Sequence, residues 1–267
     1  MTAPPIPLAA PAWRLRALEN LAAVELWSAV PTLPLVGLAR CGDGHAVLVL
    51  PGFTSSDSGT WYLRNVLRMK RFDAHGWGLG TNVGPHPRVV RAMQRRLLAL
   101  ADRTGRSVSL VGWSLGGIYA RELARSHPDH VRVVVTLGSP FHLRDDDRSS
   151  AELLYRRLAP RRDPFPGRLH REHHRDPMPV PTTSIYTRTD GVVRWHACID
   201  ETGPTSENIE VRGTHSGLGF NAAALLAVVD RLAQPAETWR PFTPPLAVRH
   251  LYPAPASWEP RWLSETA

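Results

Sequence analysis

The sequence predicts an α/β fold with a mostly parallel central sheet flanked by helices. From residue 46 onward, short β-rich apolar runs alternate with segments of helix length, which is the pattern of right-handed strand–helix–strand units. The run 46–50 is apolar throughout and ends at Pro51-Gly52, so we expect a buried strand there. A chain of 267 residues with 43% apolar residues can form one sizeable core, which favours a single large domain.

The remaining elements follow from the same alternation. Further strands are expected at 74–78, 107–111, 131–137, 182–186 and 208–211, and helices at 60–70, 87–103, from the turn at 112–117 to about 126, and at 221–232. Residues 141–180 break the pattern and are interpreted as an insertion. We therefore expect an N-terminal arm and helix over 1–44, the α/β domain over 45–232, and a tail over 233–267.

The two flanking segments have distinct compositions. A Pro/Ala-rich arm precedes an amphipathic helix from Trp13 to about Trp27, which we expect to pack on the domain because it carries Glu19 and Glu25 and no dense basic face. A helix lying on a membrane surface is the alternative. The tail from Gln234 has seven prolines, so it is not expected to be helical and is either draped on the surface or disordered.

Composition excludes several classes of protein. The net charge of +8 is attributed to an arginine bias on a solvated surface, and no zinc-finger or RNA-binding pattern is present, so a nucleic-acid partner is not expected. Cys41 and Cys198 are the only cysteines, too few for a disulfide-dense scaffold or a cysteine-based zinc site, although one disulfide stays open. No signal peptide or spanning segment is recognised, so we expect a cytoplasmic protein, with membrane association left open.

The turn after the 107–111 strand carries the candidate nucleophile. It reads Gly112-Trp113-Ser114-Leu115-Gly116-Gly117 and is followed by a helical pattern. Such a strand-to-helix elbow presents a strained, exposed serine, and glycines two residues before and two after it avoid collisions in the tight turn. Ser114 is therefore expected to act as the nucleophile.

A base and an orienting acid are expected later in the chain, on loops that follow later strands. Asp190 follows the 182–186 strand and His215 follows the last strand, in the order serine, acid, histidine. His215 would accept the Ser114 proton and Asp190 would fix the imidazole. Asp200 and Glu201 are the alternative acids. The backbone N–H groups of Phe53 and Leu115 are expected to form the oxyanion hole.

Five motifs together resemble the α/β-hydrolase superfamily, in particular its bacterial lipase and esterase branch. They are Pro51-Gly52-Phe53, the 112–117 turn, Leu137-Gly138-Ser139-Pro140, Asp190-Gly191-Val192-Val193 and Gly213-Thr214-His215. The resemblance spans about 45–232 and implies hydrolysis of carboxylic esters through an acyl-enzyme, with no cofactor and no metal. One departure is Pro51-Gly52, where such lipases usually have His-Gly before the oxyanion residue.

The resemblance also implies a role for the 141–180 insertion. Residues 141–180 fall where the superfamily places its cap, and within 156–175 there are seven arginines and three histidines, so a lid over an anionic or interfacial substrate is expected, a solvated loop being the alternative. Trp113, Phe141 and Leu218 are candidates for the acyl pocket, although each could equally belong to the core.

These expectations define three functional hypotheses. The first is an esterase or lipase acting on a small-molecule or lipid ester. The second is an acyltransferase or thioesterase that uses the same three residues. The third is a binding protein on a hydrolase fold that docks on membranes through its basic insertion and its N-terminal helix.

Overall fold

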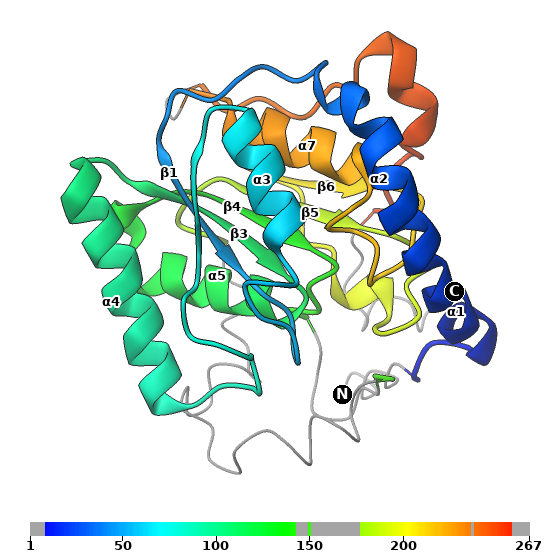
Figure 1. Cartoon of the computed structure of the whole chain (residues 1–267), viewed down its shortest axis with the longest axis horizontal. Helices are drawn as coiled ribbons and strands as arrows, with labels where there is room; N and C mark the ends of the chain where they lie inside the picture. Colours follow the sequence, from blue (N-terminus) through cyan, green and yellow to red (C-terminus); the bar gives the residue numbers. More distant parts are fainter. Residues whose placement is uncertain (1–8, 143–148, 151–176, 236–237, 258–267) are drawn as a thin grey trace, which may run out of the picture.

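The computed structural model describes residues 9–142, 149–150, 177–235 and 238–257. Its centre is a six-stranded sheet in the order β2-β1-β3-β4-β5-β6, and every neighbouring pair of strands is parallel (Figure 1). The strands are β1 (Ala46–Leu50), β2 (Asp73–Gly76), β3 (Val108–Trp113), β4 (Val131–Leu137), β5 (Thr182–Tyr186) and β6 (Ser206–Glu210). The predicted fold class and each predicted strand are confirmed, with boundaries that differ by a few residues.

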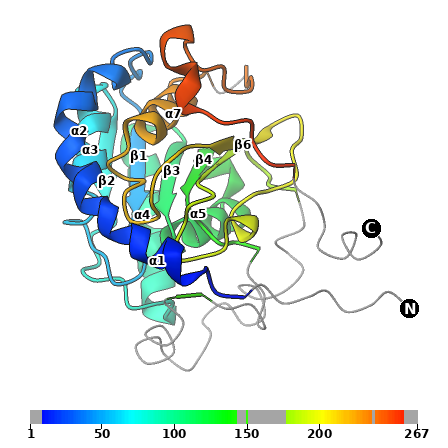
Figure 2. The ribbon, with the colours of Figure 1, turned by 90° about the vertical axis from the view of Figure 1, so that its right-hand side faces the viewer.

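Helices cover both faces of the sheet, so the domain has three layers (Figure 2). Helices α2 (Ala22–Val36), α3 (Trp61–Met69) and α7 (Ala222–Leu232) lie on one face, and α4 (Pro87–Thr104) and α5 (Leu115–Ser126) lie on the other. Alternate residues of β1 supply the two cores: Val47 and Val49 belong to the first, and Leu48 and Leu50 to the second. A strand buried on both faces must be apolar throughout, which explains the unbroken run at 46–50.

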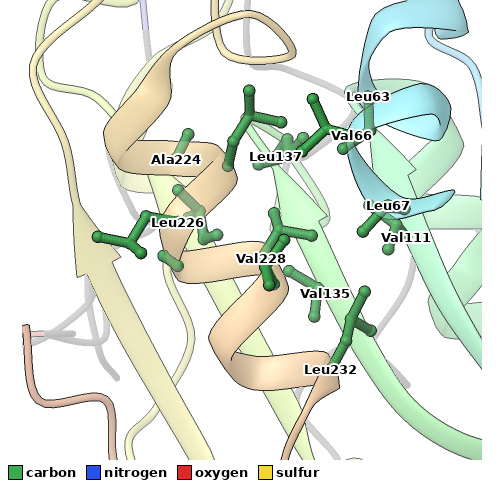
Figure 3. Packing of buried hydrophobic residues seen from close by; sticks show 14 of the residues in the cluster. Leu63, Val66, Leu67, Val111, Val135, Leu137, Ala224, Leu226, Val228 and Leu232 are labelled. Atoms are coloured by element: carbon green, nitrogen blue, oxygen red, sulfur yellow. The ribbon is translucent and has the colours of Figure 1, made fainter. Parts of the chain in front are cut away.

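Figure 3 shows the core on the α3 and α7 face. Side chains from both helices meet those of the central strands there; the labelled ones are Leu63, Val66, Leu67, Val111, Val135, Leu137, Ala224, Leu226, Val228 and Leu232. This packing fixes β3 and β4 against the helices, and the ends of these two strands carry the loops of the candidate site.

The N-terminal helices pack against the domain, as expected. They are α1 (Trp13–Leu18), the 3-10 helix η1 (Glu19–Leu21) and α2, which lies beside α7 in Figure 1. Ala29 and Val36 are buried in the core, and the Tyr62 hydroxyl donates to the Ala29 carbonyl at 2.7 Å. Among the described helices, none has the length and apolar character needed to cross a bilayer.

Helix α2 runs nine residues beyond the predicted end near Trp27, although Pro31 and Pro34 lie inside it. A proline removes the hydrogen bond to the carbonyl four residues earlier, here those of Trp27 and Val30. Both of these residues are exposed, so water can satisfy their carbonyls. The expected helix end was wrong for this reason.

The described part of the tail is draped over the domain. The Phe242 N–H donates to Glu207 at 2.7 Å and the Tyr252 hydroxyl donates to the Ala223 carbonyl at 2.8 Å. The tail contains a 3-10 helix, η5 (Leu246–Leu251), so the expectation of no helix was wrong in this segment, which lies between Pro245 and Pro253 and holds no proline. Two further 3-10 helices are η2 (Pro128–His130) and η4 (Trp195–Ala197). Most of the predicted 141–180 insertion, including all of 156–175, falls outside the described residues.

Candidate active site

The residues singled out in the sequence follow the carboxyl ends of parallel strands, which all meet at one edge of the sheet. Phe53 follows β1, Ser114 follows β3, Asp190 follows β5, and His215 follows β6. In this arrangement, chain segments that are far apart in sequence supply one site. The geometry of each loop then decides what the site can do.

Ser114 lies in a strained turn between β3 and α5. Its backbone has φ 52° and ψ −122°, a conformation that side-chain-bearing residues rarely adopt. The turn is held by a bond from the Ser114 N–H to the Leu137 carbonyl at 2.8 Å and by one from the Gly117 N–H to the Ser114 carbonyl at 2.9 Å. The side chain is only half-buried, in contrast to the fully buried strand before it.

The glycines of this turn are required by close backbone approach. A Cβ on Gly112 would lie 2.3 Å from the Cα of Gly117, and a Cβ on Gly116 would lie 2.2 Å from the Leu50 carbonyl oxygen. A Cβ on Gly117 would meet the Ser139 hydroxyl. Any side chain at these positions would therefore displace β1, the turn itself or the loop after β4.

Asp190 and His215 form a buried pair. The Nδ1 of His215 lies 2.6 Å from Oδ2 of Asp190. The other oxygen, Oδ1, accepts the N–H groups of Val192 at 2.8 Å and Val193 at 2.7 Å, which fixes the orientation of the carboxylate. Both side chains are buried, so the pair is shielded from water.

The imidazole of His215 is more basic than a free histidine. Burial alone would lower its pKa, but the charge of Asp190, the hydrogen bond to it and the charge of Glu19 together raise the pKa of His215 above the ordinary value. The bond from Nδ1 to the carboxylate leaves Nε2 as the nitrogen available to a proton donor. The arrangement therefore suits a general base.

Two contacts bring the histidine loop against the serine turn. The indole Nε1 of Trp113 donates to the main-chain carbonyl of His215 at 3.1 Å. Gly138, at the end of β4 with φ 54°, lies against the ring, because a Cβ there would be 3.1 Å from Nδ1 of His215 and 2.9 Å from Leu218. The residue before Ser114 is thus hydrogen-bonded to His215 itself.

The loop after β1 lies against Ser114. A Cβ on Gly52 would be 3.2 Å from the Cβ of Ser114, so the loop that carries Phe53 passes directly beside it. Leu115 begins α5, and the first N–H groups of a helix have no partner within the helix. Leu115 thus directly follows Ser114, and Phe53 directly follows the glycine that lies beside Ser114. The role of these two residues in an oxyanion hole stays a prediction.

Asn82 organises this loop and was not recognised in the sequence. It is completely buried, and its Nδ2 donates to the Pro51 carbonyl at 2.9 Å. Its Oδ1 accepts from Gly84 N–H and from the Tyr119 hydroxyl, each at 3.2 Å, and its carbonyl accepts the Thr54 N–H at 2.7 Å. Thr54 has φ 62°, so this network holds a second strained residue. No motif marks such an asparagine, because its partners are brought together only by the fold.

The alternative acids have other environments. The carboxylate of Asp200 lies 2.7 Å from Nη2 of Arg121 and 3.3 Å from Nε2 of His142. Burial would raise the pKa of Asp200, but Arg121 and His142 lower it well below its ordinary value. Glu201 is exposed. The geometry thus pairs His215 with Asp190 and gives Asp200 a structural ion pair.

The three acyl-pocket candidates are all buried. Trp113 and Leu218 belong to the core cluster on the α7 side, and Phe141 lies under the guanidinium of Arg121, whose Cζ is 3.8 Å from the ring centroid. Their contacts are those of structural residues, and their role in substrate binding stays a prediction.

A hydrogen-bonded Ser–His–Asp chain lies near the opposite end of β1 and β3. Nε2 of His45 is 2.8 Å from the Ser109 hydroxyl, and Nδ1 is 2.5 Å from Oδ1 of Asp43. Ser109 is completely buried within a strand, so no substrate can reach it, and burial lowers the pKa of His45. The chain ties the start of β1 to β3, which shows that the three residue types alone do not define a site.

Within the described residues, no cluster of His, Cys, Asp or Glu is arranged to hold a metal ion. Cys41 is exposed, Cys198 is buried, and both are free thiols, so the disulfide left open by the sequence is not formed.

A parallel sheet with a strained serine elbow after a central strand defines the α/β-hydrolase class of fold. A family model described as the alpha/beta hydrolase fold matches residues 37–170, half of the chain, and the protein belongs to that family. The family resemblance inferred from the sequence is thereby confirmed.

Curated relatives match a shorter stretch. The chain is 28% identical over 104 residues to the pimeloyl-[acyl-carrier protein] methyl ester esterase of Yersinia enterocolitica, covering 37% of this chain and 38% of the relative. It is 30% identical over 118 residues to the mouse (Mus musculus) serine hydrolase BPHL, covering 40% of each. The matched stretch thus spans about two-fifths of the length of these relatives.

Among solved structures, Aspergillus fumigatus lipase B superposes with a TM-score of 0.56 at 17% identity, covering 72% of this chain and 53% of the lipase chain. The thioesterase domain from the curacin biosynthetic pathway gives a TM-score of 0.50 at 13% identity, covering 72% of this chain and 92% of the domain. At such identities these likenesses show the shared fold alone.

Proposed function

We propose that this protein is a carboxylic ester hydrolase of the esterase or lipase type, with Ser114 as nucleophile, His215 as general base and Asp190 as orienting acid. The observation that carries the proposal is the 2.6 Å contact between His215 Nδ1 and Asp190, on loops adjoining the strained Ser114 turn. The names of the esterase and serine-hydrolase relatives support the same reaction class.

The mechanism follows from these positions. Nε2 of His215 accepts the Ser114 proton as the hydroxyl oxygen bonds to the ester carbonyl carbon, and the resulting oxyanion receives the N–H groups of Leu115 and Phe53. Collapse of this intermediate breaks the bond to the alcohol, which takes the proton from His215. A water molecule, deprotonated by the same imidazole, then releases the acid from Ser114.

Covalent labelling tests the proposal. A fluorophosphonate probe should add one adduct to the folded protein, seen by intact mass, and peptide mapping should place it on Ser114. Ser114→Ala should abolish the adduct, while Ser109→Ala is the matched control, because Ser109 also contacts a histidine but is completely buried. An unlabelled folded wild-type protein, or an adduct on Ser109, would contradict the proposal.

The acyl donor and the acyl acceptor need a separate assay. A thioesterase forms its acyl-enzyme from a thioester, and an acyltransferase passes the acyl group to an alcohol. The chemistry of Ser114 is the same in each case. Incubation with p-nitrophenyl esters of increasing chain length, with and without an added alcohol, should yield free acid as the main product. A predominant transesterified product would identify an acyltransferase instead.

A second property that we propose is peripheral contact with an anionic lipid surface. The observation that favours it is the outer face of α1 and α2, where Trp13, Val24 and Trp27 are 69%, 59% and 84% exposed. Arg14 and Arg16 are exposed in the same segment. Exposed aromatic residues beside arginines are typical of helices that lie in a lipid interface.

Vesicle co-sedimentation tests this contact. The wild-type protein should sediment with vesicles containing phosphatidylglycerol, less so with phosphatidylcholine alone, and a Trp13→Ser, Trp27→Ser variant should stay in the supernatant. Wild-type protein that remains in the supernatant with both vesicles would exclude the contact.

A further inference from the structure

The N-terminal helices turn both of their acids toward the domain and leave two of their tryptophans exposed. Glu19 and Glu25 are the only acids in 13–36, and both are partly buried, whereas Trp13 and Trp27 face solvent. Removing a carboxylate from water is costly unless hydrogen bonds replace its hydration. The partners of these two side chains therefore explain why the helices lie in this orientation.

Glu19 bridges the two loops that carry the acid and the base. Its Oε1 accepts the N–H of Gly191 at 2.9 Å and that of His215 at 3.0 Å, and its Oε2 accepts the N–H of Ser216 at 2.9 Å. Gly191 directly follows Asp190. One carboxylate thus holds the residue after the acid and the base itself at fixed separation.

Glu25 anchors the residue before the base. It accepts the N–H of Thr214 at 3.1 Å and also the Thr214 hydroxyl, and Asn221 Nδ2 approaches it at 3.4 Å. His215 therefore lies between two positions, 214 and 216, that are each bonded to a glutamate of the N-terminal helices.

Glycines in the two loops allow close approach of the N-terminal helices and of these glutamates. A Cβ on Gly191 would lie 2.3 Å from the Leu15 carbonyl oxygen and 2.8 Å from Cγ of Glu19. A Cβ on Gly213 would lie 2.5 Å from Oε1 of Glu25, and one on Gly217 would collide with its other oxygen. The absence of side chains at these glycines thus supports the same placement of Glu19 and Glu25 as the hydrogen bonds do.

We propose that Glu19 is a positioning residue for the reaction, which ties the Asp190 loop to the His215 loop from outside the α/β domain. The inference rests on the proposed function of Ser114, Asp190 and His215. The negative charge of Glu19 also acts on His215. Two charged groups face the His215 ring, Asp190 from the loop after β5 and Glu19 from η1, and both favour the imidazolium. Glu19 itself is held ionised, because burial would raise its pKa but the hydrogen bonds from Ser216, Gly191 and His215 lower it.

Two variants separate geometry from charge. Glu19→Ala removes the bridge, and because a small misplacement of a catalytic group is costly, we expect the rate of fluorophosphonate labelling to fall about tenfold to a hundredfold. Glu19→Gln keeps an oxygen for Gly191 and His215, while it loses the acceptor of the Ser216 N–H and the negative charge. Most of the rate at alkaline pH should therefore remain, while the acid limb of the pH profile moves to lower pH. Asn20→Ala, at the exposed next residue of η1, is the matched control and should label like the wild type.

The outcomes distinguish this inference from the proposed function. Wild-type labelling with an unchanged rate in Glu19→Ala and an unchanged pH midpoint in Glu19→Gln would overturn the role of Glu19 alone. If Glu19→Ala fails to fold, the midpoint of Glu19→Gln decides. If the wild-type protein is not labelled at all, the proposed function fails. NMR titration of the His215 ring then tests the effect of Glu19 on His215. We expect a lower titration midpoint in Glu19→Gln than in the wild type, and an equal midpoint would overturn the role of Glu19.

Discussion

The indole N–H of Trp113 donates to the carbonyl oxygen of His215 across 3.1 Å, and this bond joins the residue before Ser114 to the residue that would deprotonate it. The donor lies at the end of β3 and the acceptor in the loop after β6, 102 positions apart in the sequence. The Ser114 turn and the His215 loop are therefore held together by one buried contact as well as by the sheet.

Trp113→Phe should weaken this link. The substitution keeps most of the buried ring but leaves the His215 carbonyl without its partner, which costs about 1–3 kcal/mol when the group is buried. Urea unfolding should show that loss, and the labelling rate at Ser114 should fall. Trp27→Phe, at a position 84% exposed, should change neither quantity. Equal stability of the two variants would show that the bond is dispensable.

The pH dependence of labelling should reflect the raised pKa of His215. The imidazole accepts the Ser114 proton only when it is neutral, so the rate is low below this pKa and rises through it. Because Asp190 and Glu19 raise the pKa, the half-maximal rate should lie above pH 6.5, the ordinary value. Rate constants measured from about pH 5 to about pH 9 check this.

The same shift has a consequence for stability. A histidine whose pKa is raised on folding stabilises the fold below its unfolded value of 6.5, and that contribution is lost as pH rises through the folded pKa. His215→Gln should remove this component from the pH dependence of the free energy of unfolding.

For both pH predictions, a half-maximal labelling rate at or below pH 6.5 would show that the folded protein does not stabilise the His215 imidazolium.

Asn82→Ala should disturb the loop that carries Phe53. It removes the donor to the Pro51 carbonyl and the acceptor of Tyr119 and Gly84 in a fully buried position. We expect a loss of at least about 2 kcal/mol in the free energy of unfolding. If Phe53 is an oxyanion donor, the rate of ester hydrolysis should also fall, by about tenfold or more.

Asn65→Ala is the control for this experiment, since Asn65 is exposed on α3. Steady-state kinetics with a p-nitrophenyl ester should show the loss in kcat rather than in KM, because the oxyanion forms only in the transition state. A loss confined to KM would argue against this function of the loop.

The sheet and the serine elbow could be predicted because their signals are local. A strand buried on both faces leaves an apolar run, as at 46–50, and a turn without room for a Cβ leaves glycines at 112, 116 and 117. The order of Asp190 and His215 after later strands is likewise fixed by the chain. The strands and the elbow can thus be recognised from a few consecutive residues, and the order of the two later residues from the succession of strands.

The interactions that hold the site together could not be predicted, because they join distant segments. Glu19 contacts residues 172 to 197 positions away, whereas in the sequence alone it indicates only that the helix packs on the domain. Asn82 is an unmarked polar residue until the fold surrounds it with Pro51 and Tyr119. Helix α2 continued through Pro31 and Pro34 because its unpaired carbonyls face solvent, and exposure is not readable from the sequence.

Asp190 and Asp200 provide the sharpest test of the assignment, because substitution of each should lower a different measured quantity. Asp190→Asn should leave the fold close to wild-type stability, yet lower the labelling rate by as much as ~10⁴-fold, since an amide no longer stabilises the imidazolium or its working tautomer. Asp200→Asn should lower the stability of the fold and leave the labelling rate of the folded protein unchanged. It leaves the completely buried Arg121 without its counter-charge, which costs about 3–5 kcal/mol, while the folded fraction labels at the normal rate. Labelling rates per folded molecule, with the folded fraction taken from circular dichroism, separate the two effects. If Asp200→Asn instead abolished labelling of folded protein and Asp190→Asn spared it, the orienting acid would have to be reassigned, despite the 2.6 Å contact between Asp190 and His215.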